Sequence, residues 1–135
     1  MAVPADLVRD LIVTSPYGKL LGATLEHIET DFVRVRLPFR GEIVTVGDMV
    51  HGGAISGLID VAATAAAWTG ASPSGTPRGT TVGLSVSFLA AGRGQDLVAA
   101  ARVIRRGKTL SVIDVEVKDA AGESVARALV TYKLG

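Results

Sequence analysis

The chain contains no cysteine, which excludes disulfide bonds and any mechanism that needs a thiolate. It has only two histidines, and they show no spacing typical of a metal site. Aromatic residues make up only 4% of its 135 residues. The net charge of +1 is close to zero, so nothing indicates a nucleic-acid-binding surface. We therefore expect no metal, no other cofactor and no nucleic-acid partner.

The sequence also lacks an uninterrupted apolar run of bilayer length, because Asp60 breaks the longest one. The N-terminus has no basic segment followed by an apolar core, so no signal peptide is predicted. We expect a cytoplasmic protein with no membrane partner. A hydrophobic fraction of 48% and a charged fraction of 20% are typical of a globular chain, and the length predicts one domain over residues 1–135.

What the sequence does contain is a segment of small apolar residues from His51 to Trp68, HGGAISGLIDVAATAAAW. The helix predicted for it is apolar on all sides and should therefore be buried. Asp60 is the only charged residue between Gly52 and Trp68. A carboxylate in an apolar setting is costly unless it is paired or used, so Asp60 is the first candidate functional residue.

Most of the remaining chain is predicted to be extended. A short helix is expected from Val3 to Val13, ended by the segment Thr14–Gly18. Strands are predicted for Leu20–Thr30, Phe32–Leu37, Thr80–Phe88, Gln95–Arg105, Ser111–Lys118 and Val125–Leu134. Loops are predicted for Pro38–Val50 and Gly70–Gly79.

Alternation gives the predicted strands one apolar face. In Thr80–Phe88 that face carries Val82, Leu84, Val86 and Phe88, and Thr81, Gly83, Ser85 and Ser87 are expected on the other. Such strands, joined by hairpins, form an antiparallel sheet, and the apolar helix must cover its inner face. The fold class is therefore α+β. One helix cannot also protect the edges of such a sheet, so we expect a homodimer or homotetramer.

His51, Gly52 and Gly53, followed after four residues by Leu58 and after one more by Asp60, resemble the HGG-x4-L-x-D signature of hotdog-fold acyl-CoA thioesterases. The group with the greatest similarity is the phenylacetate-pathway type, and the order of the segments matches over nearly the whole chain. The resemblance implies a hotdog fold, in which an antiparallel sheet wraps around one long central helix. It also implies an acyl-CoA substrate and active sites at a subunit interface.

The resemblance further implies roles for individual residues. Asp60 matches the acid that acts as nucleophile or general base, and the Gly52 N–H matches the group that polarises the thioester carbonyl. Thr81 looks like the polar residue that holds the attacking water. Thr64 lies four residues after Asp60, where some relatives carry a helper hydroxyl. His51 is expected mainly to shape the loop, with direct proton transfer as the alternative.

Elementary helix geometry is compatible with these roles. The first amides of a helix have no intrahelical partner, and the helix dipole adds partial positive charge there, so Gly52 can stabilise a developing oxyanion. Gly53 lets a substrate approach the backbone. Asp60 lies eight residues further along, roughly 12 Å at 1.5 Å per residue. It should therefore serve the helix start of a neighbouring subunit.

Other residues are candidates for substrate contact. Thr45 stands six residues before His51, where the family commonly has Asn or Gln, and Val82 and Gly83 adjoin Thr81. A cationic turn follows one strand, and its charges suit the phosphates of coenzyme A. The alternative is a solvated hairpin tip. The turn consists of Arg105, Arg106, Gly107 and Lys108.

We thus predict an acyl-CoA thioesterase that hydrolyses an aryl- or medium-chain acyl-CoA to the free acid and CoA. A non-catalytic module that binds acyl-CoA or an acyl carrier is the first alternative, and Thr45 in place of the family amide is its support. A hotdog hydratase or dehydratase is the second alternative.

Overall fold

The computed structural model describes residues 4–71 and 78–135. Its helical segments are α1 (Ala5–Val8), the π-helical turn η1 (Arg9–Val13), α2 (Pro16–Leu21), the 3-10 turn η2 (Gly41–Ile43) and α3 (Gly52–Trp68). Its strands are β1 (Thr24–Glu29), β2 (Phe32–Leu37), β3 (Gly79–Phe88), β4 (Leu97–Arg106), β5 (Leu110–Lys118) and β6 (Ser124–Leu134). The predicted loop Gly70–Gly79 falls mostly on residues 72–77, which lie outside the described part.

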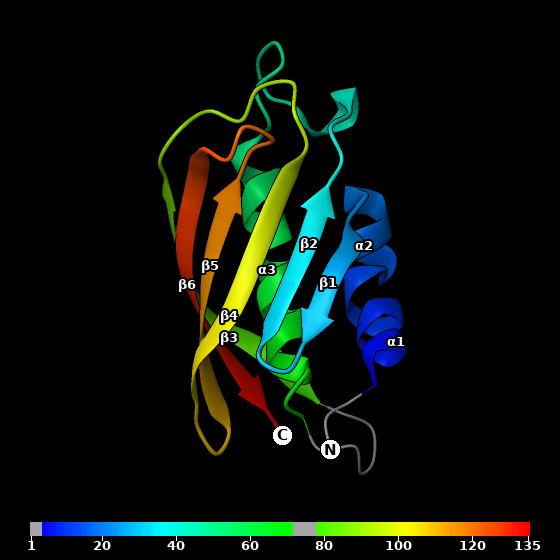
Figure 1. The fold of residues 1–135 in the computed structure, drawn as a ribbon, viewed down its shortest axis with the longest axis vertical. Helices are drawn as coiled ribbons and strands as arrows, with labels where there is room; N and C mark the ends of the chain where they lie inside the picture. The colour runs from blue at the N-terminus through cyan, green and yellow to red at the C-terminus, as the bar shows by residue number, and fades with distance from the viewer. Residues whose placement is uncertain (1–3, 72–77) are drawn as a thin grey trace.

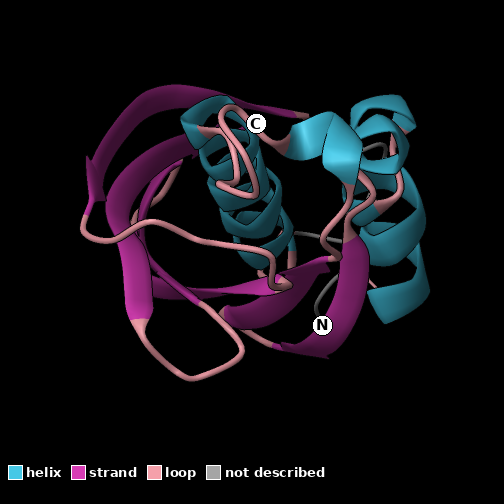
Figure 2. Cartoon of the chain, turned by 90° about the horizontal axis from the view of Figure 1, so that it is seen from above, coloured by secondary structure: helices cyan, strands magenta, loops and turns pink. Residues whose placement is uncertain are grey.

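In the described part of the chain, six strands form one antiparallel sheet in the order β1-β2-β4-β5-β6-β3. The sheet curves around α3, which runs along its inner face (Figures 1 and 2). This arrangement confirms the predicted α+β fold with one long central helix. None of the helices among residues 4–71 and 78–135 is both long and apolar enough to cross a membrane.

The core lies between α3 and the inner face of the sheet. Leu58, Ile59 and Ala62 on the helix are fully buried, as are Val35 and Val115 on the strands. Alanines dominate the second half of α3, and their small side chains let the sheet backbone approach the helix closely. The prediction of burial on all sides is wrong for one stripe of the helix, whose residues are only partly buried: Ser56, Gly57, Asp60 and Thr64.

The N-terminal region contains a second helix that the sequence analysis did not predict. The Ser15 hydroxyl accepts a hydrogen bond from the Gly18 N–H at 3.2 Å, which caps α2, and Pro16 occupies its first turn. Gly22 ends the helix in the left-handed conformation, with φ of 88°. The predicted strand from Leu20 is therefore wrong at its start, and β1 begins at Thr24.

A β-bulge changes the orientation of the first residues of β3. The pairing with β6 passes from Thr81 opposite Tyr132 to Gly83 opposite Thr131, so Val82 is an extra residue. One extra residue reverses the face of every side chain before it. Thr81 therefore lies beside Tyr132 on the helix side of the sheet. Simple alternation wrongly placed it on the opposite face.

β3 is also an edge strand, and much of its apolar surface is uncovered. Leu84 and Phe88 pair with the buried residues Val130 and Ala126, so they face the helix side. They are nevertheless 43% and 54% exposed. An exposed apolar edge strand is a ready site for pairing with another chain.

Candidate active site

The Asp60 carboxylate forms the centre of the candidate site. It projects from the middle of α3 and is half-buried. The Thr81 hydroxyl, brought to the helix side by the bulge, donates a hydrogen bond to Asp60 Oδ1 at 2.7 Å. A short hydrogen bond to a charged acceptor is among the stronger ones in proteins, so this contact fixes the carboxylate. The structure thus brings together two residues that the sequence analysis singled out separately.

A small cavity of about 190 Å³ adjoins this carboxylate. Thr64 is the second hydroxyl candidate. It lines this cavity from α3, together with Asp60 and Val61. The opposite wall comes from η1 and α2, which the sequence analysis did not associate with the site. The residues of that wall are Leu11, Ile12, Ser15 and Tyr17.

The start of α3 is capped by a side chain. His51 is the N-cap residue, and its Nδ1 accepts a hydrogen bond from the Gly53 N–H at 2.7 Å. Among the described residues, no protein group accepts the Gly52 N–H. The Phe88 ring covers this helix start, because a Cβ on Gly52 would lie 3.4 Å from it. Gly52 therefore lies next to an apolar side chain.

Within one chain, the Asp60 carboxylate and the Gly52 amide do not meet. They lie on the same straight helix, eight residues and roughly 12 Å apart along its axis. The uncovered side chains of β3 run beside both residues, from Thr81 next to Asp60 to Phe88 next to Gly52.

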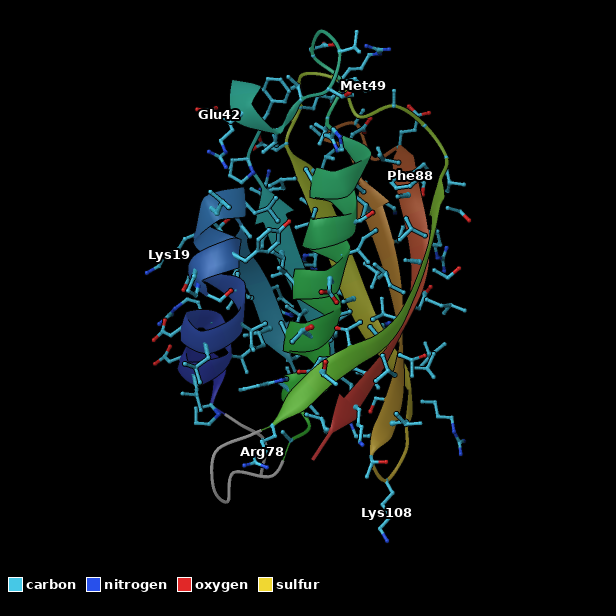
Figure 3. All side chains as sticks on the ribbon, turned by 180° about the vertical axis from the view of Figure 1, so that it is seen from behind. Lys19, Glu42, Met49, Arg78, Phe88 and Lys108 are labelled. Carbon is cyan, nitrogen blue, oxygen red and sulfur yellow. The ribbon has the colours of Figure 1, made fainter. Side chains whose placement is uncertain are left out.

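The structure separates the predicted cationic cluster into two parts. Arg106 is half-buried, and its guanidinium contacts Asp31 Oδ1 at 2.7 and 3.0 Å and the Ala67 carbonyl at 3.1 Å. Arg106 thus fits neither the predicted cluster for the CoA phosphates nor its alternative, a solvated hairpin tip, because a carboxylate and the C-terminus of α3 bind its guanidinium. Arg105 and Lys108 are exposed. Lys108 lies at the opposite end of the molecule from Phe88 (Figure 3).

The remaining candidates lie on either side of the site. Thr45 is exposed in the loop before α3, where its backbone N–H donates to the Met49 carbonyl at 2.9 Å. Val82 is 53% exposed at the bulge. Gly83 pairs with Thr131 on the outer face of the sheet. The structure therefore does not place Gly83 on the same side as Thr81.

Sequence reasoning missed two residues near Asp60. Tyr132 is buried, and its hydroxyl accepts a hydrogen bond from Trp68 Nε1 at 2.8 Å. Burial raises the pKa of the Tyr132 phenol and the Asp60 charge adds to the rise, whereas the Trp68 hydrogen bond lowers it. Tyr17 belongs to α2, whose Ser-Pro start is a recognisable helix signal. Among the described residues, no group of three or more potential metal ligands is gathered.

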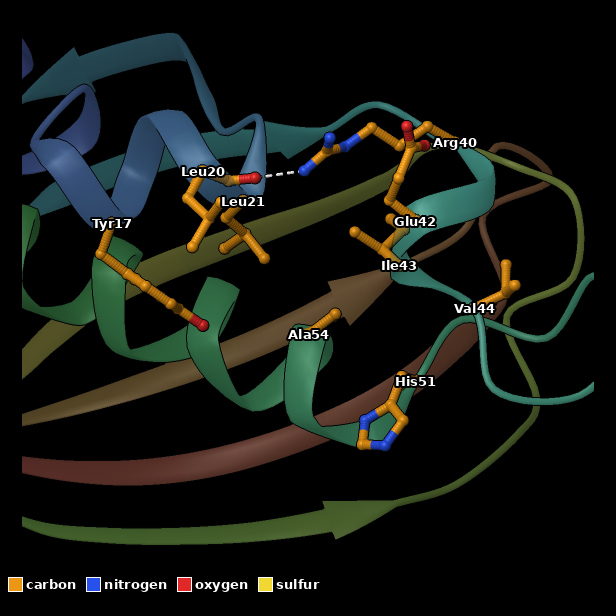
Figure 4. Close-up of a pocket in the computed structure, with 9 residues that line it drawn as sticks. All are labelled: Tyr17, Leu20, Leu21, Arg40, Glu42, Ile43, Val44, His51 and Ala54. Carbon is orange, nitrogen blue, oxygen red and sulfur yellow. Dashed lines mark hydrogen bonds between the residues drawn. The ribbon is translucent and has the colours of Figure 1, made fainter.

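A second, larger cavity of about 460 Å³ lies further toward the start of α3 (Figure 4). Leu20 and Leu21 of α2 and Ala54 of α3 form apolar walls, and the segment before α3 closes its far side. Arg40 donates a hydrogen bond to the Leu20 carbonyl and so ties that segment to the end of α2. The cavity is lined by Tyr17, Leu20, Leu21, Arg40, Glu42, Ile43, Val44, His51 and Ala54.

Comparison with known proteins places this arrangement in a family. The chain is 29% identical over 136 aligned positions to the medium/long-chain acyl-CoA thioesterase YigI of Escherichia coli, with 89% of this chain and 86% of that protein covered. A thioesterase family protein from Silicibacter pomeroyi has a similar structure, with a TM-score of 0.88, 25% identity and 96% of both chains covered. The Escherichia coli PaaI protein shares the fold, with a TM-score of 0.82, 22% identity and coverage of 95% of this chain and 90% of PaaI.

The profile of the thioesterase superfamily matches residues 47–126, which is more than half of the chain. The match begins just before the glycine-rich start of α3 and includes Asp60 and Thr81. Together with the sheet wrapped around α3, it confirms the resemblance in the sequence: the chain belongs to the thioesterase superfamily and is a hotdog-fold thioester hydrolase.

Proposed function

We propose that this protein hydrolyses an aryl- or medium-chain acyl-CoA thioester to the free acid and CoA. The observation that carries the proposal is the hydrogen bond from Thr81 to Asp60 beside a cavity, because it orients a carboxylate toward space that a substrate can enter. The similarity to YigI, whose name includes medium/long-chain acyl-CoA thioesterase, supports acyl-CoA as the substrate class.

In the proposed reaction, Asp60 acts as general base. Thr81 holds Oδ1, and Oδ2 removes a proton from water as the water oxygen attacks the thioester carbonyl carbon. The carbonyl electrons move onto oxygen, and the Gly52 N–H of another subunit stabilises the oxyanion. When the C–S bond breaks, the thiolate takes the proton from Asp60. Direct attack by Asp60, which gives an anhydride that water then hydrolyses, is the alternative course.

The proposed site requires at least a homodimer, because Asp60 and Gly52 do not meet within one chain. Pairing of two copies along β3 would cover the exposed side chains of Leu84 and Phe88. It would also bring the α3 start of one subunit toward the Asp60 of the other. We extend the proposal to a homodimer or homotetramer with its active sites at the subunit interface.

Fewer residues are proposed to contact CoA than the sequence predicted. Arg105 and Lys108 keep exposed cationic side chains that suit phosphate groups. Arg106 is withdrawn from this role, because the Asp31 carboxylate and the end of α3 already bind its guanidinium.

Thiol release from a panel of aryl- and alkyl-CoA thioesters tests the proposal. We expect Asp60→Asn and Asp60→Ala to lower kcat by at least ~100-fold, a typical scale for loss of a general base. Glu123→Gln is the matched control, because it removes one carboxylate from an exposed turn that lines neither cavity. Size-exclusion chromatography shows whether each variant keeps its assembly state.

Two outcomes would contradict the proposal. Retention of most activity in Asp60→Ala would remove Asp60 from the mechanism. Tight binding of acyl-CoA without turnover by the wild-type protein would instead favour a binding module.

A further inference from the structure

One side chain lines both cavities that lie along α3. Tyr17 lines both the cavity of about 190 Å³ beside Asp60 and the cavity of about 460 Å³ toward the helix start. On α3, the cavities touch Val61 and Ala54, respectively. These positions are seven residues apart, and therefore share one face of the helix, with Gly57 between them. The cavities and Tyr17 thus lie in one line along this face of α3.

Tyr17 reaches this position because Gly57 has no side chain. A Cβ on Gly57 would lie only 2.4 Å from the Tyr17 hydroxyl oxygen and 3.2 Å from the ring. The ring therefore rests directly on the backbone of α3. Figure 4 shows the Tyr17 side chain extending from α2 toward α3. A larger residue at position 57 would push the Tyr17 side chain away from the space between the cavities.

Several contacts fix the helix that carries Tyr17. Ser15 caps α2 at one end, and the Arg40 guanidinium binds the Leu20 carbonyl at the other. Gly18 packs against the end of η1 so closely that a Cβ would lie 1.9 Å from the Val13 carbonyl oxygen. Because α2 is held at both ends and along its side, Tyr17 has a defined place rather than that of a loose surface residue.

We propose that Tyr17 sets the maximum length of the acyl group that this enzyme accepts. The inference rests on the proposed acyl-CoA thioesterase function. With the thioester carbonyl beside Asp60, the acyl group enters the cavity lined by Leu11, Ile12 and Val61. Tyr17 closes the far end of that cavity. A longer chain must pass it to reach the apolar space lined by Leu20 and Leu21.

The volumes support a length limit. An apolar cavity of roughly 150 Å³ can hold a molecule the size of benzene. The cavity beside Asp60, at about 190 Å³, therefore has room for an acyl group of that size. Removal of the Tyr17 ring would join this cavity to the space of about 460 Å³ beyond it.

The test measures kcat/KM for straight-chain thioesters from butanoyl-CoA to hexadecanoyl-CoA in the wild type, Tyr17→Ala and Tyr17→Phe. We expect Tyr17→Ala to raise the ratio of dodecanoyl-CoA to butanoyl-CoA by at least about tenfold, because burial of two further methylene groups suffices for that change. Tyr17→Phe keeps the ring and should keep the wild-type ratio. Tyr17→Leu gives a shorter apolar side chain as a second variant if Tyr17→Ala unfolds.

An unchanged ratio in folded Tyr17→Ala or Tyr17→Leu would overturn the inference, as would an equal rise in Tyr17→Phe. If the wild type hydrolyses no thioester of the panel, the proposed function fails separately. The same ratio is then measured from Kd values by calorimetric titration, and the length dependence on Tyr17 must appear there.

Discussion

Thr81 Oγ1 donates a 2.7 Å hydrogen bond to Asp60 Oδ1, and the contact exists because Val82 bulges out of the pairing between β3 and β6. A regular strand would turn the hydroxyl to the outer face of the sheet. The bulge thus turns Thr81 from the outer face of the sheet to the helix side, where its hydroxyl can hold the Asp60 carboxylate. Bulges beside active sites commonly re-aim a side chain in this way.

The first prediction concerns this hydrogen bond. Thr81→Val keeps the shape of the side chain but removes the donor, so we expect kcat/KM to fall by about tenfold, corresponding to about 1.4 kcal/mol. Thr81→Ser keeps the hydroxyl and should retain most of the activity. Steady-state thiol release measures both variants. Full activity in Thr81→Val would show that the bond does not position the carboxylate for catalysis.

The second prediction isolates the amide at the start of α3. Gly52 is the first residue of the helix, a position that proline favours, and His51 has a ψ of 136°, which suits a residue before proline. Gly52→Pro therefore removes the N–H with little change in the backbone. We expect kcat to fall by about 100-fold, as for loss of one oxyanion donor. Gly52→Ala keeps the N–H and controls for the added carbon next to Phe88.

The same variant tests whether two subunits share one site. Asp60→Ala and Gly52→Pro subunits are each expected to be inactive alone. Their mixed dimer would contain one site with both wild-type groups, so random co-assembly should restore about a quarter of wild-type activity. Co-expression with two different affinity tags isolates the mixed species. If the site lies within one chain, the mixture stays inactive.

The third prediction concerns the Arg106 guanidinium. It bridges Asp31 in the β1–β2 turn to the last carbonyls of α3, and its side chain is 26% exposed. Arg106→Ala should lower the free energy of unfolding by about 1–3 kcal/mol, because it leaves Asp31 and the helix end without their partner. Arg105→Ala, at an exposed neighbouring position, should change it by less than about 0.5 kcal/mol. Urea denaturation compares the two, and equal midpoints would contradict this role.

The fourth prediction concerns alkaline pH. Burial raises the pKa of Tyr132 above its ordinary value of 10.0, so the folded state holds this proton more tightly than the unfolded chain does. The resulting stabilisation is complete below pH 10.0 and is lost as the pH rises through the folded-state pKa. The Tyr132→Phe variant has no phenol proton to lose at this position. The amount by which its Tm lies below that of the wild type should therefore shrink as the pH rises above 10.0.

Tyr17→Phe is the matched control for the alkaline series. It removes one phenol hydroxyl from a residue that is 49% exposed and leaves Tyr132 in place. A constant difference in Tm between Tyr132→Phe and the wild type would contradict the assignment of this titration to Tyr132.

Local patterns were sufficient to predict the central helix and most of the sheet. The apolar segment around Asp60 differs by one residue from α3, and the alternating strands β2 and β5 lie within one residue of the predicted bounds. These elements were predictable because burial on one face leaves a period in the sequence itself. The start of α2 was also encoded, by Ser15 and Pro16, but that pair was interpreted as the end of the preceding helix.

The errors at Thr81 and Arg106 have a different origin. A bulge is defined by two strands together, so the sequence of β3 alone does not show that Val82 is an extra residue. Arg106 binds Asp31, which is 75 residues away in the sequence. No local pattern distinguishes Arg106 from the exposed Arg105 beside it. The roles of Asp60 and Gly52 as parts of a shared site remain predictions for the experiments above.

The bulge at Val82 also divides β3 into two segments that can evolve separately. Thr81 lies before it, and the apolar residues from Leu84 to Phe88 follow it with their own register. Substitutions in the second segment can therefore alter the surface at the sheet edge without rotating the hydroxyl that holds Asp60. Deletion of Val82 alone would exchange the faces of the first segment and leave the second unchanged. This single extra residue keeps the chemistry of the strand independent of its edge surface.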